Sequence, residues 1–105
     1  MKEVDEFGLS RRDRQTIASI FNKHRGVEHV LIFGSRAKGV FHAGSDIDLA
    51  ITGSDISHEV VRRIKNDFNE SSLPYNVDVI NFSTLDNADL KEHILRVGKP
   101  VYSPS

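Results

Sequence analysis

The sequence predicts a single α/β (α+β) domain, residues 1–105, in which a mixed sheet of about four strands has helices packed mainly on one face. The first observation is an alternation along the chain. Short apolar runs bounded by glycine, proline or aspartate alternate with segments whose apolar residues recur at helical spacing, in the order α-β-α-β-α-β-α-β. The second observation is length, because 105 residues support one hydrophobic core and leave no room for a second domain.

The first helix is predicted to follow a lead-in, residues 1–9, that we expect to be loosely held. Ser10 and Asp13 have the spacing of a capping box, and Gly26 ends the helical pattern. The apolar stripe between them has four members: Ile17, Ile20, Phe21 and His24. Three arginines crowd the first turn, where the helix dipole disfavours cations: Arg11, Arg12 and Arg14. We favour a solvated face for them, and the alternative is a contact for an acidic partner or a phosphate.

Four strands are predicted: residues 27–33, 46–52, 75–81 and 99–102, the last of them at an edge. Gly34 and Ser35 end the first strand and turn the chain into a short helical segment that starts near Arg36. The link to the second strand is short, so we expect the first two strands to be neighbours.

Two longer helices complete the predicted fold. The first has an apolar stripe and a solvated face, the stripe being Val60, Val61, Ile64 and Phe68. Its solvated face is expected to contain Arg62, Arg63, Lys65, Asn66 and Asp67. The second helix is predicted to begin at Ser83, with Asp86 as its capping partner, and to end at Gly98. Its stripe is Leu90, Ile94 and Val97.

Composition narrows the class of protein. With 14 Lys and Arg against 15 Asp and Glu, the net charge is -1, so the chain has no bulk positive field and binding of long nucleic acid is disfavoured. Cysteine is absent, which excludes disulfides and thiol-bound metals. No stretch has the apolar length of a signal peptide or a membrane span, so we expect a cytoplasmic protein with no membrane partner.

The turn after the first strand has the features of a phosphate cradle. Gly34 lets the backbone approach a ligand, and Ser35 offers a hydroxyl and an N–H beside a helix N-terminus. Arg36 and Lys38 add positive charge, and Arg36 is the better candidate for a triphosphate contact because its guanidinium matches phosphate geometry. Ser45 is expected to brace the loop that follows. A plain strand-to-helix turn is the alternative for Gly34 and Ser35.

Two carboxylates follow the cradle at strand spacing. Asp46 and Asp48 alternate with Ile47, Leu49 and Ile51, so both carboxylates project from one face while the apolar residues pack the other. Like charges held together are stabilised by a cation. Ligands that are all oxygen indicate a hard ion, Mg²⁺, with Mn²⁺ also compatible.

Asp78 is the third candidate carboxylate. It lies in the predicted strand 75–81 with Val77 and Val79 on the opposite face, so it joins the other two carboxylates if the two strands are neighbours. Three carboxylates can hold two Mg²⁺ ions for an in-line phosphoryl displacement, and Asp78 could also accept the proton of the attacking hydroxyl. A single Asp that faces water is the alternative. The five histidines lack metal-ligand spacing, although His42 lies in the loop that faces this predicted site.

These residues resemble a known superfamily. Gly34-Ser35, ten intervening residues, Asp46-x-Asp48 and a later Asp78 are similar to the motif of the DNA polymerase β-like nucleotidyltransferases. The fuller string FGSRAKG…GSDIDLAI most resembles the minimal nucleotidyltransferase (MNT) proteins, which are often encoded beside a HEPN-domain partner. The resemblance covers nearly the whole chain and implies the nucleotidyltransferase fold.

The resemblance also implies a function. It implies a Mg²⁺-dependent transfer of a nucleoside monophosphate, with ATP as the expected NTP, to a hydroxyl acceptor. The acceptor could be a tyrosine of a HEPN partner, with this chain as antitoxin. A non-catalytic antitoxin or regulatory module that covers its partner is the alternative. Transfer to a small molecule such as an aminoglycoside is less favoured, because we expect no acceptor-binding domain beside this one. Homo- and hetero-oligomers both remain open.

Overall fold

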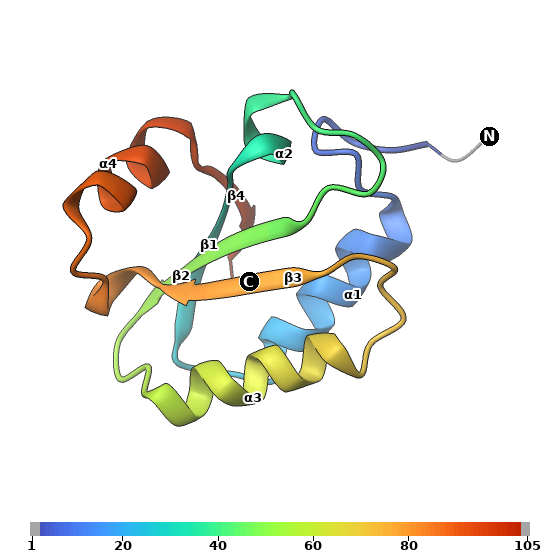
Figure 1. Cartoon of the computed structure of the whole chain (residues 1–105). Coiled ribbons are helices and arrows are strands. Elements are labelled where there is room, and N and C mark those ends of the chain that lie inside the picture. Colours follow the sequence, from blue (N-terminus) through green and yellow to red (C-terminus); the bar gives the residue numbers. More distant parts are fainter. Residues whose placement is uncertain (1–2, 104–105) are drawn as a thin grey trace.

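The computed structural model describes residues 3–103, and its four strands form one mixed sheet between two layers of helices (Figure 1). The elements along the chain are α1 (Arg11–Asn22), β1 (Val27–Phe33), α2 (Ser35–Lys38), β2 (Ile47–Gly53), α3 (His58–Asn69), β3 (Val77–Asn81), the 3₁₀ helix η1 (Phe82–Thr84), α4 (Ala88–Val97) and β4 (Lys99–Tyr102). The predicted order of helices and strands is confirmed, with η1 as an addition. None of the helices in residues 3–103 has the length and apolar character to span a bilayer.

The sheet has the order β3-β2-β1-β4. β1 runs antiparallel to β2 and to β4, and β2 runs parallel to β3. The first two strands are therefore neighbours, as predicted from their short connection. Because β1 ends where β2 and β3 begin, the C-terminal end of β1 and the N-terminal ends of the other two strands meet at one end of the sheet.

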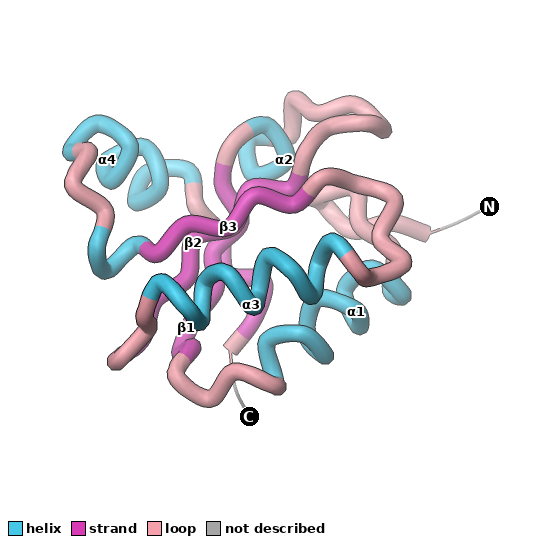
Figure 2. The backbone as a smooth tube through the Cα atoms, turned by 60° about the horizontal axis from the view of Figure 1, so that its bottom comes forward, coloured by secondary structure: helices cyan, strands magenta, loops and turns pink. Residues whose placement is uncertain are grey.

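Helices cover both faces of the sheet, in unequal layers. The two longest helices, α1 and α3, lie together on one face (Figure 2), and their apolar stripes bury the alternate strand residues that include Ile32, Leu49 and Val79. The shorter α4 lies on the opposite face (Figure 1), where Ile94 packs with Phe33 and Ala50 in a second, smaller cluster. The prediction that helices lie mainly on one face is confirmed by α1 and α3, whereas the predicted helix near the C-terminus, observed as α4, forms a partial second layer on the other face.

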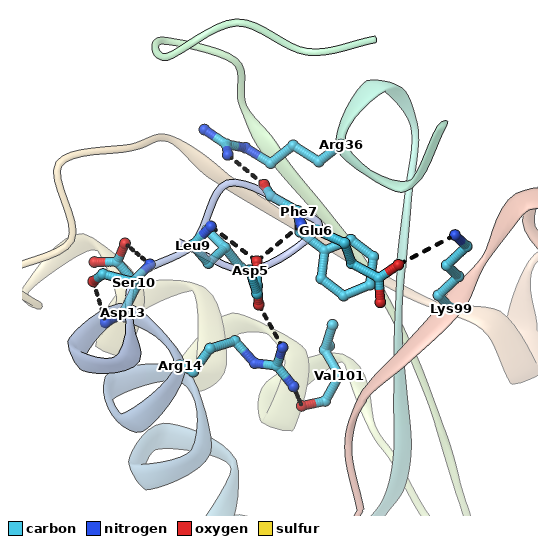
Figure 3. A network of polar contacts seen from close by, with 10 residues as sticks. All are labelled: Asp5, Glu6, Phe7, Leu9, Ser10, Asp13, Arg14, Arg36, Lys99 and Val101. Carbon is cyan, nitrogen blue, oxygen red and sulfur yellow. Dashed lines mark hydrogen bonds and ion pairs between the residues drawn. The ribbon is translucent and has the colours of Figure 1, made fainter. Parts of the chain in front are cut away.

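The lead-in is more ordered than the sequence indicated. Residues 3–9 form a tight turn in which Phe7 and Leu9 are only 2% and 1% exposed and join the main core (Figure 3). The expectation of a loosely held segment was wrong for these residues, while residues 1–2 lie outside the described part of the chain. The reason is spacing: two apolar residues separated by one glycine have neither strand nor helix length, so only tertiary contacts reveal their burial.

Several boundaries and one face also differ from prediction. The second and third strands begin at Ile47 and Val77, later than predicted, and the first helix ends at Asn22, before His24. The last helix begins at Ala88, because the side chain of Asn87 accepts a hydrogen bond from the N–H of Leu90 at 3.0 Å and caps it. Ser83 lies instead in η1, where the Asn81 side chain caps the turn. On α3, Asp67 is partly buried, and its Oδ2 lies 3.0 Å from Nε2 of His24, two residues after the end of α1; this contact lowers the pKa of Asp67.

The burial of Phe7 makes a prediction about stability. Phe7→Ala should lower the free energy of unfolding by about 3 kcal/mol, because it removes a buried aromatic ring and leaves a cavity. Val4→Ala is the control, since Val4 belongs to the same segment but is 57% exposed, and it should change stability by less than about 0.5 kcal/mol. Urea denaturation measures both values. Near-wild-type stability of Phe7→Ala would mean that the segment is detached from the core.

Candidate active site

The three candidate carboxylates lie at the end of the sheet where β2 and β3 begin. Asp48 is opposite Asp78 in the parallel register of these strands, so the two side chains share one face. Their neighbours in β2, Ile47 and Leu49, are fully buried on the other face. Asp46 directly precedes β2 and is exposed. The strand pairing therefore brings together the acidic residues that are 30 or more positions apart in sequence.

Gly34 places the β1 turn directly against the Asp48 carboxylate. Phe33, the last residue of β1, is paired with Asp48 across the antiparallel ladder, so Gly34 follows at the same end of the sheet. Its φ of 75° lies in the left-handed region, and a Cβ at this position would be 2.4 Å from Asp48 Oδ2. Only glycine satisfies both the backbone conformation and the contact. Ser35 begins α2 beside this carboxylate.

A shallow surface hollow lies between the turn and two of the carboxylates, Asp46 and Asp48. Its lining residues come from the start of α2, from the following loop and from the start of β2: Ser35, His42, Gly44, Ser45, Asp46 and Asp48. Four of the residues predicted for the site thus share one hollow. His42, which the sequence placed only in the loop facing the site, is also part of it.

The carboxylates at this site repel one another. Burial raises the pKa of Asp48 above its ordinary value, and repulsion from Asp78 and then from Asp46 raises it further, while His93 partly offsets these effects. The ionised form of Asp48 therefore destabilises the folded protein. A bound cation would lower that cost.

The chemical nature of the three carboxylates suits a divalent metal ion. Their donors are carboxylate oxygens, which suit Mg²⁺ or Mn²⁺. Burial first, and then repulsion from Asp78 and Asp46, raises the pKa of Asp48, and a bound cation would relieve the repulsive part. In residues 3–103, however, no group of three His, Asp or Glu side chains is close enough to hold a metal ion as the side chains stand. The structure therefore brings the three carboxylates to one end of the sheet without assembling a complete set of ligands.

Arg36 does not have the place predicted for it. Its side chain is 1% exposed, and its guanidinium donates to the carbonyl oxygens of Phe7 at 2.7 Å and Ser45 at 2.8 and 3.1 Å. The guanidinium lies over the rings of Phe41 and Tyr75, at 5.1 and 4.6 Å from their centroids. The expected triphosphate contact is corrected on this ground, because a buried fork that already binds main-chain carbonyls cannot also reach a phosphate.

The remaining cradle residues agree better with expectation. Ser45 is nearly buried and its Oγ accepts a hydrogen bond from the N–H of His42 at 3.0 Å, so it braces the loop as predicted. Lys38 ends α2 and is exposed, and its phosphate contact stays a prediction.

His93 is the residue near the site that sequence reasoning missed. It lies on α4, its ring packs edge-on against Phe33 at a centroid distance of 6.2 Å, and it is close enough to Asp48 to lower that residue's pKa. The available signal was its spacing from Leu90 and Val97, three residues before it and four residues after it, which places it on the helix face that covers the sheet. Without the sheet, nothing indicated that this face continues to the carboxylates.

Solved structures with a similar fold include two toxin–antitoxin complexes. One, a toxin-antitoxin crystal structure with AMP-PNP, superposes with a TM-score of 0.73 at 20% identity and covers 89% of this chain and 75% of that chain. Another contains a tri-AMPylated Shewanella oneidensis HEPN toxin with an MNT antitoxin, with a TM-score of 0.54 at 17% identity and coverage of 87% and 73%. At these identities the likeness shows the nucleotidyltransferase-type fold.

Sequence comparison identifies the family. A curated relative, described as the probable protein adenylyltransferase MntA of Haemophilus influenzae, is 41% identical over 69 residues, which are 65% of this chain. The match spans only 60% of that relative's length. The profile of the family described as "Polymerase beta, Nucleotidyltransferase" matches residues 15–105, which include the Gly34 turn and all three carboxylates. This chain therefore belongs to the polymerase beta nucleotidyltransferase family.

Proposed function

We propose that this protein is a Mg²⁺-dependent nucleotidyltransferase that transfers AMP from ATP to a hydroxyl group, and that the acceptor is a tyrosine of a HEPN-type partner for which it is the antitoxin. The observation that carries the chemistry is the contact between the Gly34 turn and Asp48, with Asp46 and Asp78 at the same end of the sheet. It sets a candidate phosphate cradle next to a candidate metal clamp. A cytoplasmic location is part of the proposal.

In this proposal each residue has a separate task. The Gly34 backbone and Ser35 bind the β- and γ-phosphates, with Lys38 beside them. Asp46 and Asp48 hold two divalent ions, and Asp78 holds one of them. When bound, the ions neutralise charge on the phosphates and polarise the α-phosphate.

Asp78 has a further task because it is the outermost acidic residue, on the edge strand β3. It orients the acceptor hydroxyl and accepts its proton. The acceptor oxygen then bonds to the α-phosphorus, the bond to the β-phosphate breaks and pyrophosphate leaves. Such catalysis consists mainly of positioning and charge neutralisation.

The proposed partner follows from two sources of support. One relative is a probable protein adenylyltransferase, and one solved structure of similar fold is a complex of a tri-AMPylated HEPN toxin with an MNT antitoxin. The hollow itself is shallow and open to the surface, so an acceptor carried by another macromolecule could approach it. To test the proposal, the protein is incubated with labelled ATP, Mg²⁺ and the product of the neighbouring gene. Covalent label and a mass gain of one AMP on a tyrosine of that product is the expected result, and label on neither protein would contradict it.

A second candidate function is a non-catalytic antitoxin that acts by covering its partner. The observation that favours it is the lack, in residues 3–103, of three acidic or histidine side chains within metal-binding distance. Asp46→Asn separates the two functions. A transferase variant should no longer neutralise the partner although it still binds it, whereas a covering protein should neutralise it as well as wild type does.

Loss of a clamp carboxylate should abolish transfer. Asp46→Asn and Asp48→Asn should each lower turnover on the order of a thousandfold, because charge on the phosphates is no longer neutralised in the transition state. Labelled transfer to the partner measures the rate, and circular dichroism checks that the fold is retained. Asp86→Asn is the matched control, an exposed carboxylate in the loop before α4, and should keep full activity. Normal transfer by either clamp variant would refute the assigned roles.

Asp48→Asn should also stabilise the metal-free protein at neutral pH. A carboxyl whose pKa is raised on folding lowers stability as pH rises from its unfolded value of about 3.9 through its raised folded value. The gain from Asn should therefore be absent near pH 4 and complete above the folded pKa. Urea denaturation in EDTA at both pH values measures it, and added Mg²⁺ should stabilise wild type more than the variant. An Asp48→Asn protein that is less stable than wild type at neutral pH would contradict the electrostatic argument.

A further inference from the structure

The turn formed by residues 3–9 is organised around one carboxylate. Asp5 Oδ1 accepts hydrogen bonds from the N–H groups of Phe7 at 2.8 Å and Leu9 at 3.0 Å, and its Oδ2 pairs with Arg14 of α1 at 2.6 Å (Figure 3). Arg14 thus has a structural partner, unlike the solvated position expected for it. Main-chain bonds between Asp5 and Leu9 and between Gly8 and Asp5 close the turn. The turn is therefore a defined structure, and Asp5 holds both its backbone and its attachment to α1.

This N-terminal turn is also fixed to the far edge of the sheet. Arg14 donates to the carbonyl oxygen of Val101 in β4 at 3.1 Å, and Glu6 pairs with Lys99 of the same strand at 3.5 Å (Figure 3). Phe7 and Leu9 are buried in the main core. Contacts with α1, with β4 and with the main core therefore fix the position of the turn relative to the sheet.

Arg36 joins the N-terminal turn to the loop that leads to the carboxylates. Its Nη1 donates to the carbonyl of Phe7 at 2.7 Å, while Nε and Nη2 donate to the carbonyl of Ser45 at 3.1 and 2.8 Å. A longer contact of 3.5 Å reaches the carbonyl of Ala43. Asp46 is bonded directly to Ser45, so the guanidinium fixes the peptide that carries this candidate metal ligand.

Gly8 shows how closely the two segments approach. Its φ is 75°, and a Cβ there would lie 2.3 Å from the ring of Phe41 and 3.0 Å from Nη1 of Arg36. Phe41 belongs to the same loop as Ser45 and also covers one face of the guanidinium. No side chain larger than hydrogen fits between the N-terminal turn and the active-site loop without displacing one of them.

The guanidinium depends on all of its carbonyl partners. The hydrogen bonds of Arg36 in the described structure go to main-chain carbonyls, and its charge is further stabilised by the rings of Phe41 and Tyr75. Removing one acceptor from a buried charged donor leaves an unsatisfied group at a high cost, so the remaining bonds rearrange with it. Displacement of the Phe7 carbonyl should therefore also weaken the hydrogen bonds between Arg36 and the Ser45 carbonyl.

We propose that residues 3–9 are a positioning segment of the active site, which acts through the Phe7 carbonyl and Arg36 to fix the Ser45–Asp46 peptide. The segment lies before residue 15, where the match to the family profile begins, so it is a feature of this chain beyond the matched region. The role of the segment in catalysis rests on the proposed nucleotidyltransferase function. The structural coupling between the segment and the loop is independent of that function.

Asp5→Ala tests the proposal without touching the core or the hollow. It removes the acceptor for two N–H groups and the partner of Arg14, so it releases the Phe7 carbonyl. Asp13→Ala is the matched control, because Asp13 accepts from the N–H of Ser10 at 3.0 Å and caps α1 close by, but has no link to Arg36. Thermal unfolding shows whether both variants remain folded.

Hydrogen–deuterium exchange of the amides of residues 42–48 is the first measurement. Asp5→Ala should accelerate exchange in this loop by about tenfold, and Asp13→Ala should leave it unchanged. Arg36→Lys should accelerate it in both the loop and residues 3–9, since an ammonium cannot bind both carbonyls with a guanidinium's geometry. Acceleration confined to residues 3–14 in Asp5→Ala would overturn the proposal.

Enzyme kinetics is the second measurement. In Asp5→Ala the KM for Mg·ATP should rise about tenfold, as is usual when the support of a metal ligand is lost, and excess Mg²⁺ should partly restore the rate. Asp13→Ala should keep the wild-type KM. If wild type itself transfers no AMP, the proposed function fails and the exchange experiment alone decides the coupling. If wild type is active and Asp5→Ala has an unchanged KM, the positioning role fails while the function stands.

Discussion

The strand register at the start of β2 is the constraint on which the candidate site depends. Phe33 is paired with Asp48, and Asp48 with Asp78, so one line across three strands sets the Gly34 turn beside two carboxylates. A shift of one residue in either pairing would turn the carboxylates to the opposite face, into the main core. The fully buried Ile47, Leu49 and Ile51 oppose such a shift, because they would then face away from the core.

One face of the sheet packs the larger apolar core, and the other face contains the candidate site. α1 and α3 pack a large apolar core on one face, whereas α4 packs a smaller cluster that contains Phe33 and Ala50 on the other. Asp48 and Asp78 lie on this second face, and Asp48 is paired with Phe33, a member of its apolar cluster. The candidate site therefore borders the smaller cluster, and His93 of α4 lies at this boundary.

Two buried or partly buried charges at the site have opposite relations to stability. Asp48 is disfavoured as an anion by burial and by its acidic neighbours, as expected for groups kept for function. Arg36 is a buried cation whose hydrogen bonds are satisfied by carbonyls and whose faces are covered by aromatic rings. From α2, Arg36 connects the N-terminal turn to the loop that ends at Ser45. It therefore stabilises the loop that leads directly to Asp46 and Asp48.

Local spacing alone determined the strands, the apolar stripes, the glycine turn and the alternation that puts Asp46 and Asp48 opposite Ile47 and Leu49, because these features depend on neighbours along the chain. Folding decided the rest. Arg36 has the same sequence context whether it binds phosphate or carbonyls, and its burial depends on Phe7 and Ser45, which meet only in the tertiary structure. The place of Asp78 likewise required the pairing of β2 with β3, and the order of residues 3–9 required a core to pack against.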